Sequence, residues 1–258
     1  MPSFANQFIL GIKSHSTAWK FIRKHGLWHY FVWPVLLAIL ILWMGASAIS
    51  SATEYTIELI KAWIWDDPQK DGLWETVVYW CIWFIFKVLF FYTYFILNKY
   101  IVFIILSPIL AIVSERVDSL ESGKEFPFSL PQLMKDIFRG IAIALRNLFL
   151  EYAATLALLL LSAFIPLLAP IYPFAVFFIA AYFYGFAFLD YNCERYRLSY
   201  SESVQLIRKN MGLATGIGSV FSLLFFIPVL GGIIAPILSC VAASLAYGKV
   251  IRGGVVRN

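Results

Sequence analysis

One lysine lies deep inside an apolar stretch of the chain, where a charged side chain is costly. Lys87 stands between Phe86 and Val88, about ten residues from either end of the apolar run from Leu73 to about Leu97. An ionisable group at that depth of a membrane belongs by default to a functional path or to a buried charge pair. We therefore expect Lys87 either to face a pore and attract an anion or to pair with another buried group.

A second polar set recurs along one face of an expected helix. Asp136, Arg139, Arg146 and Asn147 fall within about 100° of that face, and Glu151 lies at its edge. The plainer interpretation is the solvated face of an amphipathic helix. The functional interpretation is a pore-lining wall, in which Arg139 and Arg146 attract anions. The spacing is compatible with both.

Catalytic and metal-site patterns are scarce among the remaining residues. His25 and His29 are four residues apart, which places two ligands on one helical face, but Gly26 lies between them and no third ligand is near in sequence. No Ser/His/Asp set, phosphate-binding glycine loop or paired-carboxylate motif occurs. The cysteines have no paired or metal-type spacing: Cys81, Cys193 and Cys240. We therefore expect neither an enzyme nor a bound metal or other cofactor.

The elements that hold these residues are expected to be membrane helices. Hydrophobic residues make up 61% of the 258 residues and charged residues 14%, against about half and a quarter in a soluble domain. Lipid must therefore be the solvent for part of the chain. Aromatic residues reach 18%, and many of the 9 Trp lie near the ends of apolar runs, as anchoring at a membrane surface predicts. The net charge of +5 is thinly spread, which suits a basic lipid-facing side better than nucleic acid.

Two apolar runs are long enough to cross a bilayer, from Tyr30 to Ile49 and from Leu73 to about Leu97. Residues 54–75 carry six acids against two bases, whereas the N-terminal arm and the C-terminal tail carry bases and no acid. Basic segments stay on the cytoplasmic side, so we expect the loop 50–72 outside and both termini inside. The arm over residues 1–26 repeats its apolar residues at a helical period and is expected to lie along the membrane surface.

The segment after the second crossing is expected to leave the membrane. Ser107-Pro108 interrupts the apolar run from Ile101 to Val113, and a proline there should bend or end the helix. The polar stretch from Ser114 to Lys135 then predicts the largest water-exposed region. We assign residues 114–140 to a cytoplasmic segment.

The C-terminal half has short apolar runs that come in pairs, each closed by a turn of the form Ile-Pro-x-Leu. The pairs are Tyr152–Ile165 with Tyr172–Leu189 and Leu213–Ile227 with Ile233–Val250. This weak repeat predicts two helical hairpins that enter the membrane and turn back. Such hairpins can surround a transporter's binding region, or the prolines can simply close two tight turns. Small residues that permit close helix packing begin the second pair: Gly212, Gly216 and Gly218.

These patterns predict an all-α integral membrane protein with one membrane domain over residues 1–258. It would contain two long transmembrane helices, two short and partly penetrating helical hairpins, and an N-terminal amphipathic helix. Residues 1–26 would form the interfacial arm, 27–113 the two crossings and the following helix, 114–140 the cytoplasmic segment, and 141–250 the paired hairpins.

A series of short motifs resembles the CysZ sulfate permeases, which belong to the wider family related to an etoposide-induced protein. In order, the motifs are Ala18-Trp19-Lys20, Gly26-Leu27, Pro34-Val35-Leu36, Ser107-Pro108 followed by Glu115, Met134-Lys135-Asp136, Asp190-Tyr191, and Ile227-Pro228 with Ala235-Pro236. The resemblance covers nearly the whole chain. It implies two long membrane helices with half-penetrating hairpins, assembled as oligomers in the bacterial inner membrane, and the import of sulfate for cysteine synthesis.

One position departs from the family pattern. The family's sulfate-contacting motif reads Gly-Leu-Arg or Gly-Ile-Arg, whereas this chain reads Gly26-Leu27-Trp28-His29. Trp28 offers one N–H and no charge, and His29 is only partly protonated near pH 7. Backbone N–H groups after Gly26 could still bind an anion, with charge from Arg23, Lys24 and His25 in the preceding turn.

The resemblance therefore implies an inner-membrane permease for sulfate or a related small anion, without ATP hydrolysis of its own. Its expected partners are that anion, membrane lipids and further copies of the chain, and no nucleic acid. An alternative from another class is a non-transporting membrane scaffold or lipid-organising protein of the same family.

Overall fold

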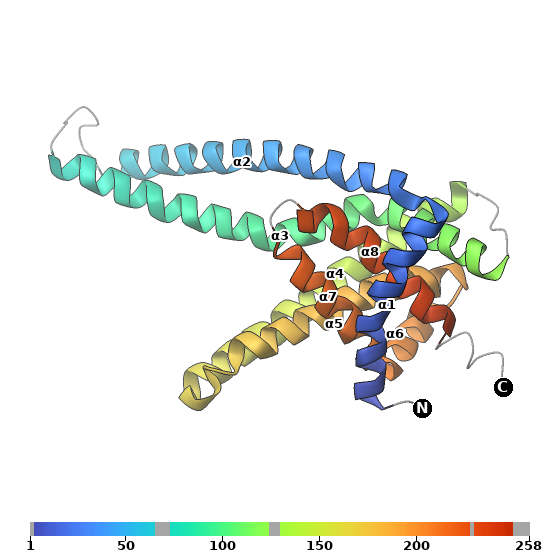
Figure 1. Ribbon diagram of the computed structural model, residues 1–258. Helices are drawn as coiled ribbons and strands as arrows, with labels where there is room; N and C mark the ends of the chain where they lie inside the picture. The colour runs from blue at the N-terminus through green and yellow to red at the C-terminus, as the bar shows by residue number, and fades with distance from the viewer. Residues whose placement is uncertain (1–2, 65–72, 124–129, 228–229, 250–258) are drawn as a thin grey trace. The chain divides into compact units, whose positions relative to one another are not determined.

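Every element in the described part of the chain is helical. The computed structural model describes residues 3–64, 73–123, 130–227 and 230–249, with the backbone alone at 38, 41–42, 60–64, 73, 75, 92–104, 130–133, 136–137 and 230. The elements in these residues (Figure 1) are α1 Phe4–His25, η1 Leu27–Phe31, α2 Val32–Ile64, α3 Leu73–Ser122, α4 Leu130–Phe164, η2 Pro166–Leu168, α5 Tyr172–Arg195, α6 Tyr200–Lys209, α7 Met211–Phe225 and α8 Leu230–Tyr247. The expected all-α fold is confirmed.

Contacts divide the chain into two compact units. Residues 36–103, with most of α2 and the first part of α3, form what we call the paired-helix unit. Residues 1–35 and 104–258 form the core unit. The single membrane domain expected over residues 1–258 stays a prediction, because the division concerns packing alone.

The short helix α7 packs against α1, α5 and α8 within the core unit. Its glycines allow two neighbouring backbones to approach closely. A Cβ atom on Gly216 would collide with the carbonyl of Phe8 in α1, and one on Gly218 would collide with the carbonyl of Ala181 in α5. Backbones can come this near only where side chains are absent. The expected close packing at these glycines is confirmed.

The hairpin of α4 and α5, drawn in yellow in Figure 1, contains the two helices of the described chain that are long and apolar enough to cross a membrane. Their apolar parts are Phe138–Phe164 and Tyr172–Arg195, of 27 and 24 residues. The prediction of a short run that begins at Tyr152 is wrong. Helix α4 continues through Arg139 and Arg146, because both side chains find partners inside the core unit. This first hairpin is therefore long enough to cross, not only to penetrate partly.

The two runs predicted to cross lie in α2 and α3, which are 33 and 50 residues long. Part of each run falls on side chains outside the described set. Large apolar side chains of the paired-helix unit point outward, and Trp43, Trp80 and Phe84 are each more than half exposed. An apolar surface of this kind suits lipid as its solvent.

The second hairpin, of α7 and α8, is short and mostly buried. The two helices have 15 and 18 residues, which confirms the short length expected for this pair. Residues 212–219 of α7 and 235–247 of α8 are all buried. Its turn proline, Pro228, lies outside the described residues.

Helix α3 does not end at Pro108 but continues to Ser122. The prediction of a water-exposed region from Ser114 onward is therefore wrong for its first turns, where Ser114 and Asp118 are buried. An apolar stripe that includes the fully buried Val117 continues past the proline and packs into the core unit. The polar side chains between these apolar positions bind partners inside the protein.

Candidate functional site

The basic end of α1 leads into the motif that the resemblance identifies as anion-binding. Gly26 ends the helix in the left-handed conformation, with φ 67°, and its N–H donates to the carbonyl of Ile22. The side chains of Arg23 and Lys24 are exposed beside this turn, whereas Leu27 is buried. Two exposed cations next to a helix end create a local positive field that attracts anions.

Trp28 occupies the position where the family pattern has arginine, and His29 follows it. The indole of Trp28 is 46% exposed and lies edge-on to Trp19, with 5.2 Å between ring centroids. His29 Nδ1 lies 3.3 Å from the carbonyl oxygen of Gly26. The ring of His25 packs on an aromatic side chain one helical turn earlier in α1. Since neither Trp28 nor His29 carries a fixed charge, the permanent charge at this end comes from the neighbouring basic residues.

Lys87 lies in a groove of the paired-helix unit. The groove has a volume of about 590 Å³ and is lined by α2 residues, including Ser50, and by α3 residues, including Trp83. The ammonium group stands 4.1 Å from the centroid of the Trp83 ring, and the side chain is half-buried. A cation above an indole ring gains electrostatic stabilisation without losing its charge. No acidic side chain is among the described residues that line this groove.

Arg139 is held by three hydrogen bonds in the core unit. Its Nη1 donates to the carbonyl of Leu198 at 2.6 Å, and its Nη2 donates to Ser203 Oγ at 2.6 Å. The same Nη2 forms an ion pair with Asp190 Oδ1 at 3.0 Å. The guanidinium thereby joins α4 to α5, to the turn that follows α5, and to α6. These contacts give Arg139 a structural role, and its pore-lining role stays a prediction.

Arg146 and Asn147 lie two turns further along α4 and contact each other. Arg146 Nη1 donates to Asn147 Oδ1 at 3.2 Å. The guanidinium carbon is 5.4 Å from the ring centroid of Phe186 and 5.7 Å from that of Tyr200. Asn147 is buried, and its Nδ2 has no hydrogen-bond partner among the described residues. Arg139, Arg146 and Asn147 thus share one unit, as expected for one helix face, while Lys87 belongs to the other.

A buried polar network that the sequence did not predict joins α3, α5 and α8. Arg195 Nε forms an ion pair with Asp118 at 3.5 Å, and its Nη2 donates to Asn192 Oδ1 at 2.5 Å. Arg195 also donates to Ser114, whose Oγ accepts a hydrogen bond from Ser244 Oγ at 3.1 Å. The available signal was spacing, because Ser114 and Asp118 stand four residues apart between buried apolar positions.

His15 is a further buried polar residue that the sequence pattern does not single out. Its Nδ1 lies 3.1 Å from the carbonyl oxygen of Gly11, and its Nε2 lies 3.1 Å from Ser239 Oγ in α8. A carbonyl can only accept, so Nδ1 carries the proton and Nε2 accepts from the serine hydroxyl. Burial lowers the pKa of His15 to about 4, which keeps the imidazole neutral near pH 7.

Comparison with known proteins places these features in a family. The model of the family "Sulfate transporter CysZ/Etoposide-induced protein 2.4" matches residues 15–236. A sulfate transporter CysZ of Vibrio atlanticus is 25% identical over 142 residues, which are 55% of this chain and 56% of that protein. A sulfate transporter CysZ of Pectobacterium atrosepticum is 21% identical over 241 residues, which are 91% of this chain and 83% of that protein. The match thus spans little more than half the length of the Vibrio relative. Because the family model covers most of the sequence, this membrane protein belongs to the sulfate transporter CysZ/etoposide-induced protein 2.4 family.

Proposed function

We propose that the protein is an inner-membrane permease for sulfate or a related tetrahedral oxyanion, and that it supports sulfur assimilation. The observation that carries this proposal is the position of Lys87 in a largely apolar groove of the paired-helix unit. Membership of the family, and the two relatives named as sulfate transporters, support the choice of anion.

The groove around Lys87 has the chemistry of a transient anion site. The ammonium is stabilised by the Trp83 ring and not by a carboxylate among the lining residues, so its positive charge remains available to a passing anion. In a medium of low dielectric constant, attraction between opposite charges is much stronger than in water. The hydroxyl of Ser50, on the α2 side of the groove, adds a hydrogen-bond donor.

The remaining predicted residues take supporting roles in this proposal. Arg23 and Lys24, exposed beside Gly26, would draw anions toward the membrane surface. Arg146 and Asn147 would line a polar part of the path on α4. Transport would run down an electrochemical gradient or with a coupled ion, because the chain contains no nucleotide-binding motif. We further propose a homo-oligomer with both termini in the cytoplasm.

Flux of labelled sulfate into proteoliposomes tests the proposal. Wild-type protein should carry more sulfate than empty vesicles, Lys87→Ala should reduce the flux at least about tenfold, and Lys87→Arg should keep most of it because the charge remains. Lys13→Ala, which removes an exposed lysine of α1, is the matched control and should leave the flux unchanged.

Two outcomes would contradict the proposal. Wild-type flux equal to that of empty vesicles would favour the alternative, a non-transporting membrane scaffold or lipid-organising protein. Equal flux for wild-type and Lys87→Ala would remove Lys87 from the path. Normal growth of a deletion strain on limiting sulfate, in a host without another importer, would independently favour the scaffold.

A further inference from the structure

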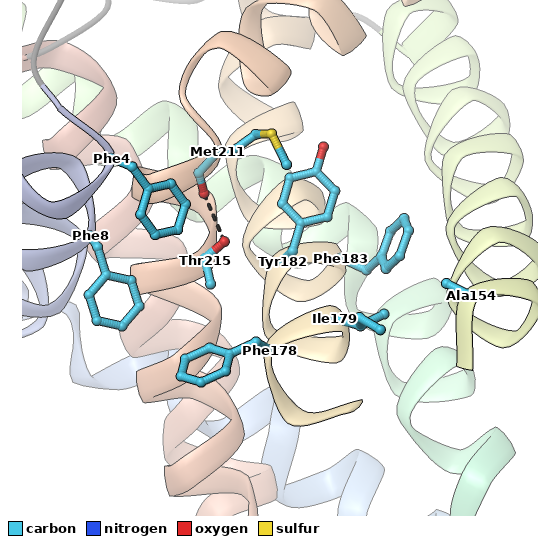
Figure 2. A pocket seen from close by; sticks show the side chains of 9 residues that line it. All are labelled: Phe4, Phe8, Ala154, Phe178, Ile179, Tyr182, Phe183, Met211 and Thr215. Carbon is cyan, nitrogen blue, oxygen red and sulfur yellow. Dashed lines mark hydrogen bonds between the residues drawn. The ribbon is translucent and has the colours of Figure 1, made fainter. Parts of the chain in front are cut away.

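An apolar groove opens on the core unit between four helices (Figure 2). It has a volume of about 530 Å³, and its walls come from α1, α4, α5 and α7, with Phe4, Phe8, Ala154, Phe178 and Tyr182 among the lining residues. The one hydroxyl on the α7 wall, that of Thr215, already donates to the carbonyl of Met211 at 2.8 Å. The groove therefore presents hydrocarbon and aromatic surface along its length.

The walls of this groove are held in place by backbone contacts. Phe4 and Phe8 belong to the stretch of α1 whose backbone rests directly on glycines of α7. Gln7 Nε2, on the same turn, lies 3.4 Å from both the carbonyl of Lys209 and Asn210 Oδ1. The Phe8 ring meets Phe178 of α5 edge-on, with 6.3 Å between centroids. The cavity is thus preformed, so a ligand need not order its walls.

One end of the groove is positively charged. In Figure 2 the hydroxyl of Tyr182 lies at the end where Met211 begins α7. Arg208 is exposed in the last turn of α6, three residues before Met211 of the groove wall, and its positive charge and that of Arg146 act on this hydroxyl. The charge of Arg146 also acts on Asp190, which is already paired with Arg139. The mouth of the apolar cavity therefore combines a phenol hydroxyl with the positive field of nearby arginines.

We propose that this groove binds an anionic phospholipid, with an acyl chain along the aromatic walls and the phosphate at Arg208 and the Tyr182 hydroxyl. Guanidinium groups bind phosphate oxygens in a planar, two-pronged geometry, and the phenol supplies one more donor. A free oxyanion would use the charged end alone and would gain nothing from the apolar walls. This inference does not depend on the permease function, because Arg208 and the groove walls lie outside the proposed anion path, and Arg146, which that path includes, is left unaltered in the test.

Native mass spectrometry of the full-length protein in detergent tests the lipid site. Phosphatidylglycerol should remain bound under detergent conditions that remove phosphatidylcholine, a lipid with no net charge. Arg208→Gln should weaken phosphatidylglycerol binding about fivefold. Ala154→Leu, which fills the groove from α4, should weaken it at least as much. Arg116→Gln, which removes an exposed arginine of α3, is the matched control and should bind like wild type.

The other occupants give different results, and each would overturn the proposal. Equal retention of the two lipids would show that no headgroup site exists. Phosphatidylglycerol binding that Arg208→Gln leaves unchanged would show the same. Sulfate protection against heat that Arg208→Gln abolishes and Ala154→Leu leaves unchanged would indicate a free-anion site at the mouth of the groove. A dimer that Ala154→Leu dissociates in detergent would indicate a second copy in the groove. Sulfate flux measured on Arg208→Gln should equal wild type, so failure of the lipid site and failure of the permease remain distinguishable.

Discussion

The two hairpins of the C-terminal half begin from the same sequence pattern and end in opposite surroundings. Both consist of apolar helices joined at Ile-Pro-x-Leu. At the turn of the α4–α5 hairpin, Phe164 is 85% and Leu167 81% exposed. In the α7–α8 hairpin, by contrast, most of both helices is buried against α1 and α5. Hydropathy is therefore a poor guide to which apolar helix faces lipid and which faces protein.

Side-chain size explains the difference better than hydropathy does. Helix α5 is rich in Phe and Tyr, which fill space and tolerate lipid on one side. Helices α7 and α8 are rich in Gly, Ala and Ser, which let backbones approach one another. In a membrane, where apolar surface alone gives little drive for helices to associate, such close packing is a main source of attraction. The small-residue helices accordingly form the interior of the core unit.

The largest expected effect concerns the base of the exposed hairpin, where Arg139 joins α4 to α5. Arg139→Ala should lower the free energy of unfolding by about 3–5 kcal/mol, because the buried carboxylate of Asp190 loses its partner. Chemical unfolding in detergent micelles measures it, with the exposed Arg116→Ala as control. A loss below about 1 kcal/mol would show that Asp190 does not depend on this pair, whereas adding Asp190→Asn should restore part of the stability.

The next effect distinguishes the two hairpins by how their stability depends on pH. His15 contacts the hydroxyl of Ser239 in α8, so its protonation affects the α7–α8 hairpin. The folded pKa of His15, about 4, lies below the ordinary 6.5, so the unfolded chain binds the proton more readily between these values. The full free energy of unfolding is therefore present above about pH 6.5, and it should fall by about 3 kcal/mol as the pH drops to 4. His15→Gln should flatten this dependence. An equal slope in wild type and variant would assign it to other groups.

A third effect tests the tight packing of the buried hairpin. Gly218→Ala should lower the free energy of unfolding by about 1–3 kcal/mol or more, because the added methyl group meets the Ala181 carbonyl of α5. Gly232→Ala, in α8, is the matched control, since nothing lies within 4 Å of its added Cβ. Thermal unfolding of both variants in the same detergent gives the comparison. Equal destabilisation would refute the assigned packing.

The smallest effect is expected at the exposed turn. Leu167→Ser changes a side chain that is 81% exposed, so stability in detergent should change by less than about 0.5 kcal/mol. The same change should weaken insertion of the hairpin into lipid vesicles, which fluorescence quenching by lipid-attached probes can follow. A large loss of stability in detergent would mean that another surface covers this turn.

Much of the fold follows from composition and periodicity, but helix lengths do not. The sequence predicts the all-α class, the arm over α1 and the small-residue packing of α7, because each depends on local spacing. It underestimates α4, since Arg139 and Arg146 resemble the end of an apolar run until their partners on other helices are known. Ser114 and Asp118 are wrongly predicted to be exposed for the same reason, because their hydrogen-bonding and ion-pair partners are distant in sequence. In the sequence alone, a charge that pairs with a residue distant along the chain looks the same as a charge exposed to water.

The contact of the N-terminal arm with α7 also has a consequence for biosynthesis. Gln7 and its partner Lys209 are separated by 202 residues. At about 5–20 residues per second, roughly 10–40 s pass between their synthesis. During that time the amphipathic arm has no glycine surface to dock on, and the lipid headgroup region is its natural resting place. Assembly of the core must therefore wait for the last third of the chain, and truncation before α7 should leave α1 on the membrane surface without its docking partner.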